Sequence, residues 1–554
     1  MLAALAAAAR PAGAQRVLGP GDDAFVVPHG TVRVGVSTEL TRFNERYGGG
    51  TADGTGSTLV PLAADFNIPT LGVAQFPTLG PAQATLRSLS GLSTFQLSLG
   101  RSRVTADASI ATAPISAEIG LTGWLSIGAV VPIVLTRTDV SARMDTGATA
   151  ANVGLNPAAS SDAARAANAA IKAQFDQAAA QLSAALAACE ADPSGSNCEA
   201  LNASRTQALA LIAGASEFAT ALAEFYGTDA GSASPYVPLA GSEAQLAVEA
   251  RVAAFREQYA GFGVVDVITG TGPAAARVGV ARGDLQRLTT DEAGGIRADS
   301  LYSFDRASLG DVEVMAKLKL FDTFGRGRRA RETATGFNAR AAITGVMRFG
   351  TGQPDYPNVF LDIGTGGGQN DIEVRSALDV GFGRHFWASV VARAGFQQAD
   401  NPEVRIPSYV GEPFPPFYSV QTVERKLGNY YQVDASPRFA LNDYFAVGGQ
   451  YSFRKKDRDE YTGTFTLDSA TTGVGEVTLD AATLGLGTEQ IEHRAGAGIV
   501  YSTVAAVRRG RARLPLEISF SHLQTVRGSG RTQYKFFTDQ VQLRIYTRLF
   551  GRAR

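Results

Sequence analysis

Apolar and polar residues alternate along most of the chain from about residue 31 onward, in segments of 10 to 18 residues. In the last such segment, 541–550, apolar Leu543 lies between polar Gln542 and Arg544, and the same rhythm continues on both sides. Alternation with a period of two is typical of a β-strand whose faces meet different surroundings. Either a second sheet or a lipid bilayer would cover such an apolar face and shield it from water.

The links between these segments are short and long in turn. Outer-membrane barrels have short turns at one end and long loops at the other, so this pattern favours lipid over a second sheet. The short links lie at 121–124, 383–385, 441–443 and 508–513, with a longer one at 323–337, and the long polar links lie at 145–308, 351–370, 399–428 and 458–488.

Aromatic residues concentrate beside the short links. Amphipathic rings settle at the level of the lipid headgroups, which predicts one interfacial girdle on the side of the short turns. The expected girdle residues are Trp124, Phe321, Phe382, Phe386, Trp387, Phe439, Tyr444, Phe445 and Phe550.

The predicted fold is therefore an all-β, antiparallel transmembrane barrel of about 14 strands. A count of 12 is the alternative, because segment 57–66 is short and contains Pro61, and Pro132 should mark a bulge or local break. Residues 16–144 would hold the first barrel strands and residues 309–554 the remaining ones. The expected strands are 30–43, 57–66, 93–104, 108–119, 124–138, 309–322, 338–350, 371–383, 386–398, 429–440, 444–457, 488–505, 513–526 and 533–550.

Two stretches do not fit the barrel pattern. Segment 67–92 is rich in Pro and Gly, and either a turn or a plug in the lumen would accommodate it. Within the insertion 145–308, apolar residues follow three- and four-residue steps, which predicts an α-helical hairpin over 158–227. A further helix is expected over 242–259, where Ser242 and Gln245 fit a capping box. We place this insertion in an external loop, and folding back over the pore mouth is the alternative.

The chain has two cysteines, Cys189 and Cys198, near the expected tip of the hairpin. Their spacing fits no metal or haem motif, so a disulfide bond, with an oxidising compartment, is the prediction; two separate thiols are the alternative. The Ala-rich start, residues 1–15, has the small-residue ending of a signal peptide, although an Ala-rich tail would look similar.

Composition removes several classes of protein. A net charge of −1 argues against a nucleic-acid partner, and 45% hydrophobic residues argue against a disordered chain. The chain also lacks an apolar run of about 18 residues, the length that a membrane-spanning helix requires.

If the apolar faces meet lipid, the polar faces line the lumen. Charges of both signs would be costly in a dry core, so the lumen must be wet, or filled by a plug and cross-barrel ion pairs. Basic groups outnumber acidic ones, which favours anions in an open pore; ion pairs that only brace the wall are the alternative. The predicted lumen-lining residues are Glu313, Lys317, Lys319, Arg340, Arg348, Glu373, Arg375, Asp379, Arg393, Gln397, Asp434, Arg438, Gln450, Arg454, Lys456, Glu492, Arg494, Glu517, Arg544 and Arg548.

No catalytic motif, cofactor or metal site is predicted. The four histidines are widely separated, and the adjacent Ser521 and His522 must point to opposite faces of a regular strand. Asp362, Asp371 and Glu373 lie around a glycine-rich loop where calcium is conceivable, but they lack an EF-hand spacing, so a solvated loop is favoured.

The whole pattern over about 30–550 resembles bacterial outer-membrane β-barrels, and Phe550 matches the terminal aromatic that such barrels present to their assembly machinery. The segments Ile119–Pro132, Arg348–Gly352 and Asp362–Gln369 resemble uptake channels for aromatic or other hydrophobic compounds, and 14 strands would suit the long-chain fatty-acid transporter type. The resemblance implies a transport role without naming a cargo.

We therefore expect a channel or transporter for small molecules in the bacterial outer membrane, whose partners are membrane lipid, the barrel assembly machinery and an unknown cargo. One alternative is a surface-binding or adhesion protein that uses the hairpin and keeps the barrel as an anchor. A soluble periplasmic or secreted β-protein is the other.

Overall fold

The computed structural model describes residues 23–49, 51, 54–147, 149–196, 198–229, 231, 233–324, 336–383, 385–508 and 511–548. The expected signal peptide, 1–15, and Phe550 lie outside these ranges. The chain divides into two compact units. The first holds the sequence up to Asp65 together with Val104–Ser141 and Ala298 onward, and the second holds Phe66–Arg103 and Ala142–Arg297.

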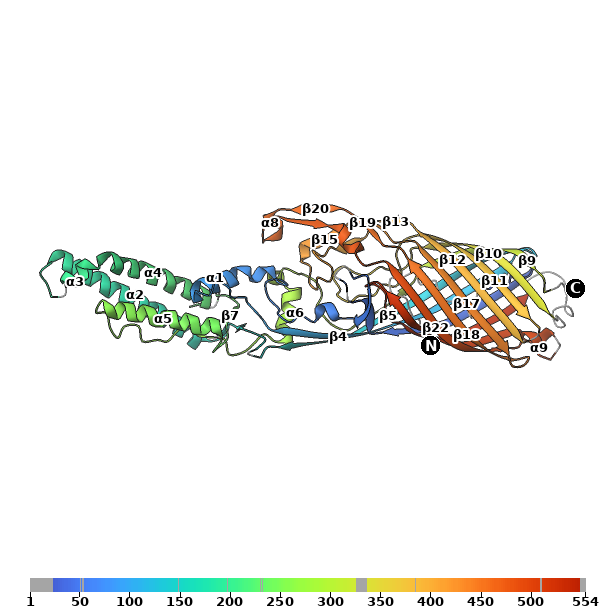
Figure 1. Ribbon diagram of the computed structural model, residues 1–554, viewed down its shortest axis with the longest axis horizontal. Coiled ribbons are helices and arrows are strands. Elements are labelled where there is room, and N and C mark those ends of the chain that lie inside the picture. Colours follow the sequence, from blue (N-terminus) through green and yellow to red (C-terminus); the bar gives the residue numbers. More distant parts are fainter. Residues whose placement is uncertain are drawn as a thin grey trace. The chain divides into compact units, whose positions relative to one another are not determined.

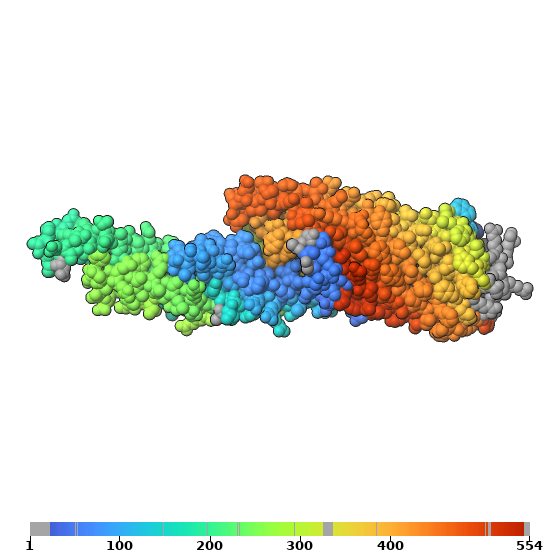
Figure 2. Space-filling model, in the orientation of Figure 1, coloured from blue at the N-terminus to red at the C-terminus, as the bar shows by residue number. Residues whose placement is uncertain are grey.

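The first unit is a closed antiparallel β-barrel of twelve strands (Figure 1). Neighbouring strands follow the order β4-β1-β24-β23-β22-β18-β17-β12-β11-β10-β9-β5, and pairing of β4 with β5 closes the ring. On the face shown in Figure 2 the barrel strands form a continuous wall, coloured from yellow to red. The barrel strands are β1 (Thr31–Phe43), β4 (Arg101–Gly120), β5 (Leu125–Asp145), β9 (Val312–Asp322), β10 (Phe337–Phe349), β11 (Asp371–Phe382), β12 (Phe386–Gln397), β17 (Tyr430–Ala440), β18 (Phe445–Lys456), β22 (Gln490–Ser502), β23 (Leu516–Ser529) and β24 (Phe537–Arg548).

The alternative count of 12 is the one that the structure has. Segment 57–66 is not a barrel strand, because β3 (Gly56–Pro61) pairs only with β2 (Glu45–Gly48) in a separate small sheet. The expected strands 93–104 and 108–119 are replaced by the single strand β4. These two changes account for the difference between 14 and 12.

The local break expected at Pro132 is a change of partner strand. Strand β5 pairs with β9 up to Val130 and with β8 (Phe304–Leu309) from Ile133 onward. Proline has no amide hydrogen to donate to a ladder, so it is tolerated where the partner strand changes. The Pro132 carbonyl still accepts a hydrogen bond from the Gly310 amide at 2.9 Å.

The long links of the barrel unit contain short elements of their own. Ile406, Val423, Leu479 and Ala481 form a small core among them. These elements are η1 (Ala64–Phe66), β13 (Ala399–Asp400), β14 (Glu403–Arg405), η5 (Phe417–Ser419), β15 (Val420–Thr422), β16 (Glu424–Lys426), β19 (Glu460–Thr462), β20 (Thr464–Leu467), α8 (Ser469–Thr472), β21 (Val477–Asp480) and η6 (Ala481–Gly485). A further helix, α9 (Val504–Arg508), lies in the short link between β22 and β23.

The second unit is mainly helical and contains the predicted hairpin. Helices α2 (Asp162–Ala191) and α4 (Arg205–Tyr226) form its arms, and α3 (Cys198–Ala203) follows the tip. The predicted disulfide Cys189–Cys198 is present and joins α2 to α3. The remaining elements are η2 (Pro77–Leu79), α1 (Gly80–Ser90), β6 (Val153–Leu155), η3 (Pro157–Ala159), β7 (Tyr236–Pro238), α5 (Glu243–Gly261), α6 (Arg282–Thr290) and η4 (Glu292–Gly294).

Packing inside the helical unit centres on three aromatic rings. Phe175 of α2, Phe218 of α4 and Phe255 of α5 lie with their ring centroids 5.2 to 5.9 Å apart. Helix α4 is long and apolar enough to cross a membrane by length and composition alone, but these ring contacts make it a helix of the bundle core. Segment 67–92 also belongs to this unit and forms α1, whose Ser88 carbonyl accepts a hydrogen bond from Arg251 of α5 at 2.5 Å.

Candidate functional site

The barrel wall is apolar on its outer face and charged on its inner face. On β11 the inward Glu373, Arg375 and Asp379 are 1%, 5% and 0% exposed, whereas the outward Ile372 and Leu378 are 45% and 40% exposed. A water-soluble protein buries its apolar residues and exposes its charges, so this wall is inverted. The interior is therefore the place to look for polar function.

The residues that the sequence placed on the lumen side fall into three groups. Those that are buried are Glu313, Lys317, Arg348, Glu373, Arg375, Asp379, Arg393, Gln397, Asp434, Arg454, Lys456, Glu492, Arg494 and Arg544. Those that are half-buried are Lys319, Arg340, Arg438, Gln450 and Glu517. The side chain of Arg548 lies outside the described part of the structure.

One inner cluster joins four strands through charged side chains. Arg348 of β10 lies 2.9 Å from Glu313 of β9 and 3.1 Å and 3.6 Å from Asp371 and Glu373 of β11. Arg375 lies 3.0 Å from Glu313 and is also paired with Glu373. The hydroxyl of Tyr430, on β17, donates a hydrogen bond to Glu373 and so ties a fourth strand to the cluster. Buried charges are tolerated where each has partners of opposite charge, as these side chains do.

Smaller pairs continue along the same inner face. Arg393 of β12 donates from Nε to Asp434 of β17 at 3.0 Å, and both side chains are almost completely buried. On β22, Arg494 donates to Glu492 at 2.7 Å. The Arg393–Asp434 pair links β12 to β17, whereas Arg494 and Glu492 lie on the same strand.

The chain just before β1 lies inside the barrel. Ala24 and Val26 pack in one buried cluster with Ala342, Ala377 and Val391, which face inward from β10, β11 and β12. The small side chains at 342 and 377 leave room for this segment. The Ala24 amide donates to Asp379 Oδ2 at 3.2 Å, and the Phe25 ring lies 5.1 Å from the guanidinium of Arg340. Residues 23–27 thus occupy part of the lumen, and we call them the inner segment.

Several residues of the barrel interior were not predicted from the sequence. Asp371 was considered only as a possible calcium ligand, and Arg33 of β1 and Glu118 of β4 were not singled out, although both alternate with apolar neighbours as lumen residues should. Asp23 of the inner segment also joins this network through Arg33, at 2.9 Å. It precedes the first strand, so no periodicity pointed to it.

Most of the expected girdle aromatics lie on the outer face near the short links. Trp124, Phe321, Phe382, Phe386, Phe439 and Phe445 are exposed, and Tyr444 is half-buried. Trp387 differs from the expectation. Because Phe386 takes the outward position, the next residue must face inward, and the Trp387 ring lies 5.0 Å from the Arg340 guanidinium.

Other candidate chemistry finds structural partners. Ser521 is buried and faces inward, whereas His522 turns outward to Asp539 at 2.8 Å, so the pair is split as the alternation predicts. Asp362 pairs with Arg306 and accepts the Tyr356 amide. Among the described residues there is no cluster of His, Cys, Asp or Glu arranged to hold a metal ion.

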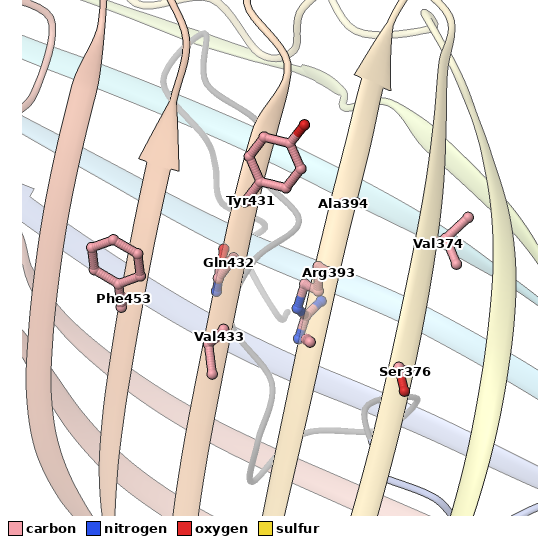
Figure 3. A pocket seen from close by; sticks show the side chains of 9 residues that line it. Val374, Ser376, Arg393, Ala394, Tyr431, Gln432, Val433 and Phe453 are labelled. Carbon is pink, nitrogen blue, oxygen red and sulfur yellow. The ribbon is translucent and has the colours of Figure 1, made fainter.

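The outer face carries an apolar groove of about 360 Å³ (Figure 3). It lies over Ala392 and Ala394, whose small side chains leave a depression between Val374 on one side and Val433 and Phe453 on the other. Arg393 and Gln432 belong to the same stretch of wall, but their side chains are buried. The groove is continuous with the apolar surface and contains no charged exposed group among its lining residues.

Comparisons with known proteins give low similarities. No family model and no curated protein sequence matches the chain. Among solved structures, an outer membrane channel from Pseudomonas putida F1 covers 95% of this chain and 99% of its own, with 8% identity and a TM-score of 0.39. A Pseudomonas aeruginosa FadL homologue covers 99% and 100% (9% identity, TM-score 0.27), and the P. putida toluene transporter TodX covers 95% and 92% (9% identity, TM-score 0.23). The fold assignment rests on the strand pairings of this chain itself.

Proposed function

We propose that this protein is a channel or transporter that passes small molecules across the bacterial outer membrane. The observation that carries the proposal is the inverted wall: apolar side chains such as Ile372 and Leu378 face outward, while charged side chains such as Glu373 face inward. Hydrocarbon stabilises apolar side chains that face outward, and a polar lumen stabilises charged side chains that face inward. Outer-membrane lipid and the barrel assembly machinery are the partners that such a protein requires.

The interior also supports a restricted rather than a wide pore. Ion pairs such as Arg393 with Asp434 cross neighbouring strands, and the inner segment occupies part of the lumen. We therefore propose that solutes pass through a narrow path whose width depends on residues 23–27. In this proposal the charged lining selects among polar or ionic groups of the cargo.

Reconstitution of the full chain in planar bilayers tests this proposal. We expect discrete conductance steps, and we expect larger steps from a variant in which the inner segment is shortened by deleting residues 23–26. The matched control is Lys455→Gln, which removes an exposed charge on the outer face of β18 and should leave conductance unchanged. Protein that inserts fully folded and never conducts, with or without the inner segment, would refute the channel.

A further inference from the structure

The inner segment places one carboxylate among cations that belong to three different strands. Arg33 of β1 donates from Nη1 to both carboxylate oxygens of Asp23, at 2.9 and 3.2 Å. Lys317 Nζ of β9 lies 3.6 Å from Asp23 Oδ1, and Arg544 Nη1 of β24 lies 3.9 Å from Oδ2. We call Arg33, Lys317 and Arg544 the cationic ring.

The ring is built to hold an anion. Its three side chains are 1%, 1% and 6% exposed, so water screens their mutual repulsion poorly. The wall supplies two nearby carboxylates: Glu118, paired with Arg33 and 3.8 Å from Lys317, and Glu517, 3.7 Å from Arg544. The Asp23 carboxylate adds a third negative charge beside these two and lies within 4 Å of all three cations of the ring.

Asp23 is not part of the wall. It precedes β1, and its segment is held by contacts that resemble those of a bound molecule more than those of a strand. The Lys317 ammonium donates to the Asp23 carbonyl at 3.2 Å, and Ala24 and Val26 pack against small inward side chains. The Phe25 ring approaches Tyr546 edge-on, with centroids 6.4 Å apart. The segment thus presents a carboxylate followed by compact apolar groups.

We infer that the cationic ring is a binding site for organic monocarboxylates and that Asp23 is its built-in competitor. This inference rests on the proposed channel and adds the chemical class of the solute: a carboxylate attached to a compact apolar group. Arg33 donates from Nη1 to both oxygens of the carboxylate while its Nη2 stays with Glu118, and Lys317 and Arg544 add charge from the other strands. When the solute carboxylate enters the ring, Asp23 leaves it, and the inner segment loses its main polar anchor.

Binding of benzoate to the detergent-solubilised full chain tests the inference without relying on conductance. In Asp23→Ala the site is vacated, and we expect benzoate to bind about tenfold or more tightly than in the unmodified protein, because competition by the attached carboxylate lowers the apparent affinity. Asp23→Glu keeps the carboxylate and should retain the weak binding. Adding Lys317→Met to Asp23→Ala should abolish the gain.

Controls separate this inference from the channel proposal. Asp539→Ala removes a carboxylate from the outer-face pair with Arg42 and should leave benzoate binding unchanged. Equal benzoate affinity in the unmodified protein and Asp23→Ala, with both barrels fully folded, would overturn the inference, as would a gain that survives Lys317→Met. A protein that binds benzoate as expected but never conducts would instead contradict the channel and leave the binding site standing.

Discussion

The substitution Leu378→Arg tests which solvent covers the outer wall. Leu378 lies in the middle part of β11, directly opposite Ala341 of β10 and Val390 of β12, and is 40% exposed. In water, an exposed leucine changed to arginine alters the free energy of unfolding by no more than about 0.5 kcal/mol. In hydrocarbon, arginine near the bilayer midplane costs about 2–4 kcal/mol. The second value corresponds to a change of about 30- to 700-fold in the unfolding equilibrium.

Guanidinium unfolding in lipid vesicles, followed by intrinsic fluorescence, measures this difference. Leu246→Arg on α5 is the matched control, because it makes the same chemical change at a leucine that is 55% exposed on the helical unit. We expect a loss of about 2–4 kcal/mol for Leu378→Arg and about 0.5 kcal/mol or less for the control. Equal, small effects for both variants would refute the conclusion that lipid covers the apolar face.

Three further predictions concern single interactions. Asp434→Ala leaves the almost fully buried Arg393 charge without this partner and should cost about 3–5 kcal/mol in the same unfolding assay, whereas Arg393→Met with Asp434→Leu should recover most of the loss. Replacing Cys189 and Cys198 by serine should destabilise the helical unit by about 2–3 kcal/mol, seen as earlier thermal loss of far-UV circular dichroism; an unchanged melt would show that the arms hold without the bond. Burial raises the pKa of Tyr236 from 10.0 to about 12, so the contribution of this group to stability is complete below pH 10 and is lost as pH rises to 12. Tyr236→Phe should therefore reduce the fall in the free energy of unfolding between pH 10 and pH 12. An equal fall in both proteins would contradict the assignment.

Alternation predicted the barrel well because the bilayer and the lumen impose opposite demands on successive residues. It failed where polar residues in a strand looked like a turn. In β4 the predicted gap, 105–107, contains the exposed Thr105 and Asp107, and the buried Ala106 between them continues the alternation of the strand. Two strands were therefore predicted where one exists. Segment 57–66 was wrongly predicted as a barrel strand, because its short alternating stretch pairs with β2 in a small separate sheet.

The lumen residues on the strands were predictable, but their partners were not. Periodicity says that Arg348 and Glu373 face inward, yet their ion pair depends on the register between β10 and β11, and no local pattern encodes register. The partners of Asp23 were even harder to predict from the sequence. It stands in a short polar stretch, and only the closed ring of strands reveals that its carboxylate meets cations from β1, β9 and β24.

The direct pairing of β1 with β24 has a consequence for biogenesis. Twelve residues of the first barrel strand, Thr31 to Arg42, lie opposite the last one, from Arg548 back to Phe537. The ring therefore stays open until the final strand has been synthesised and delivered, and a chain truncated before β24 keeps two unsatisfied edges that no lipid can solvate. Barrel closure therefore requires that translation has reached the end of β24, and only such a chain can form the β1–β24 pairing.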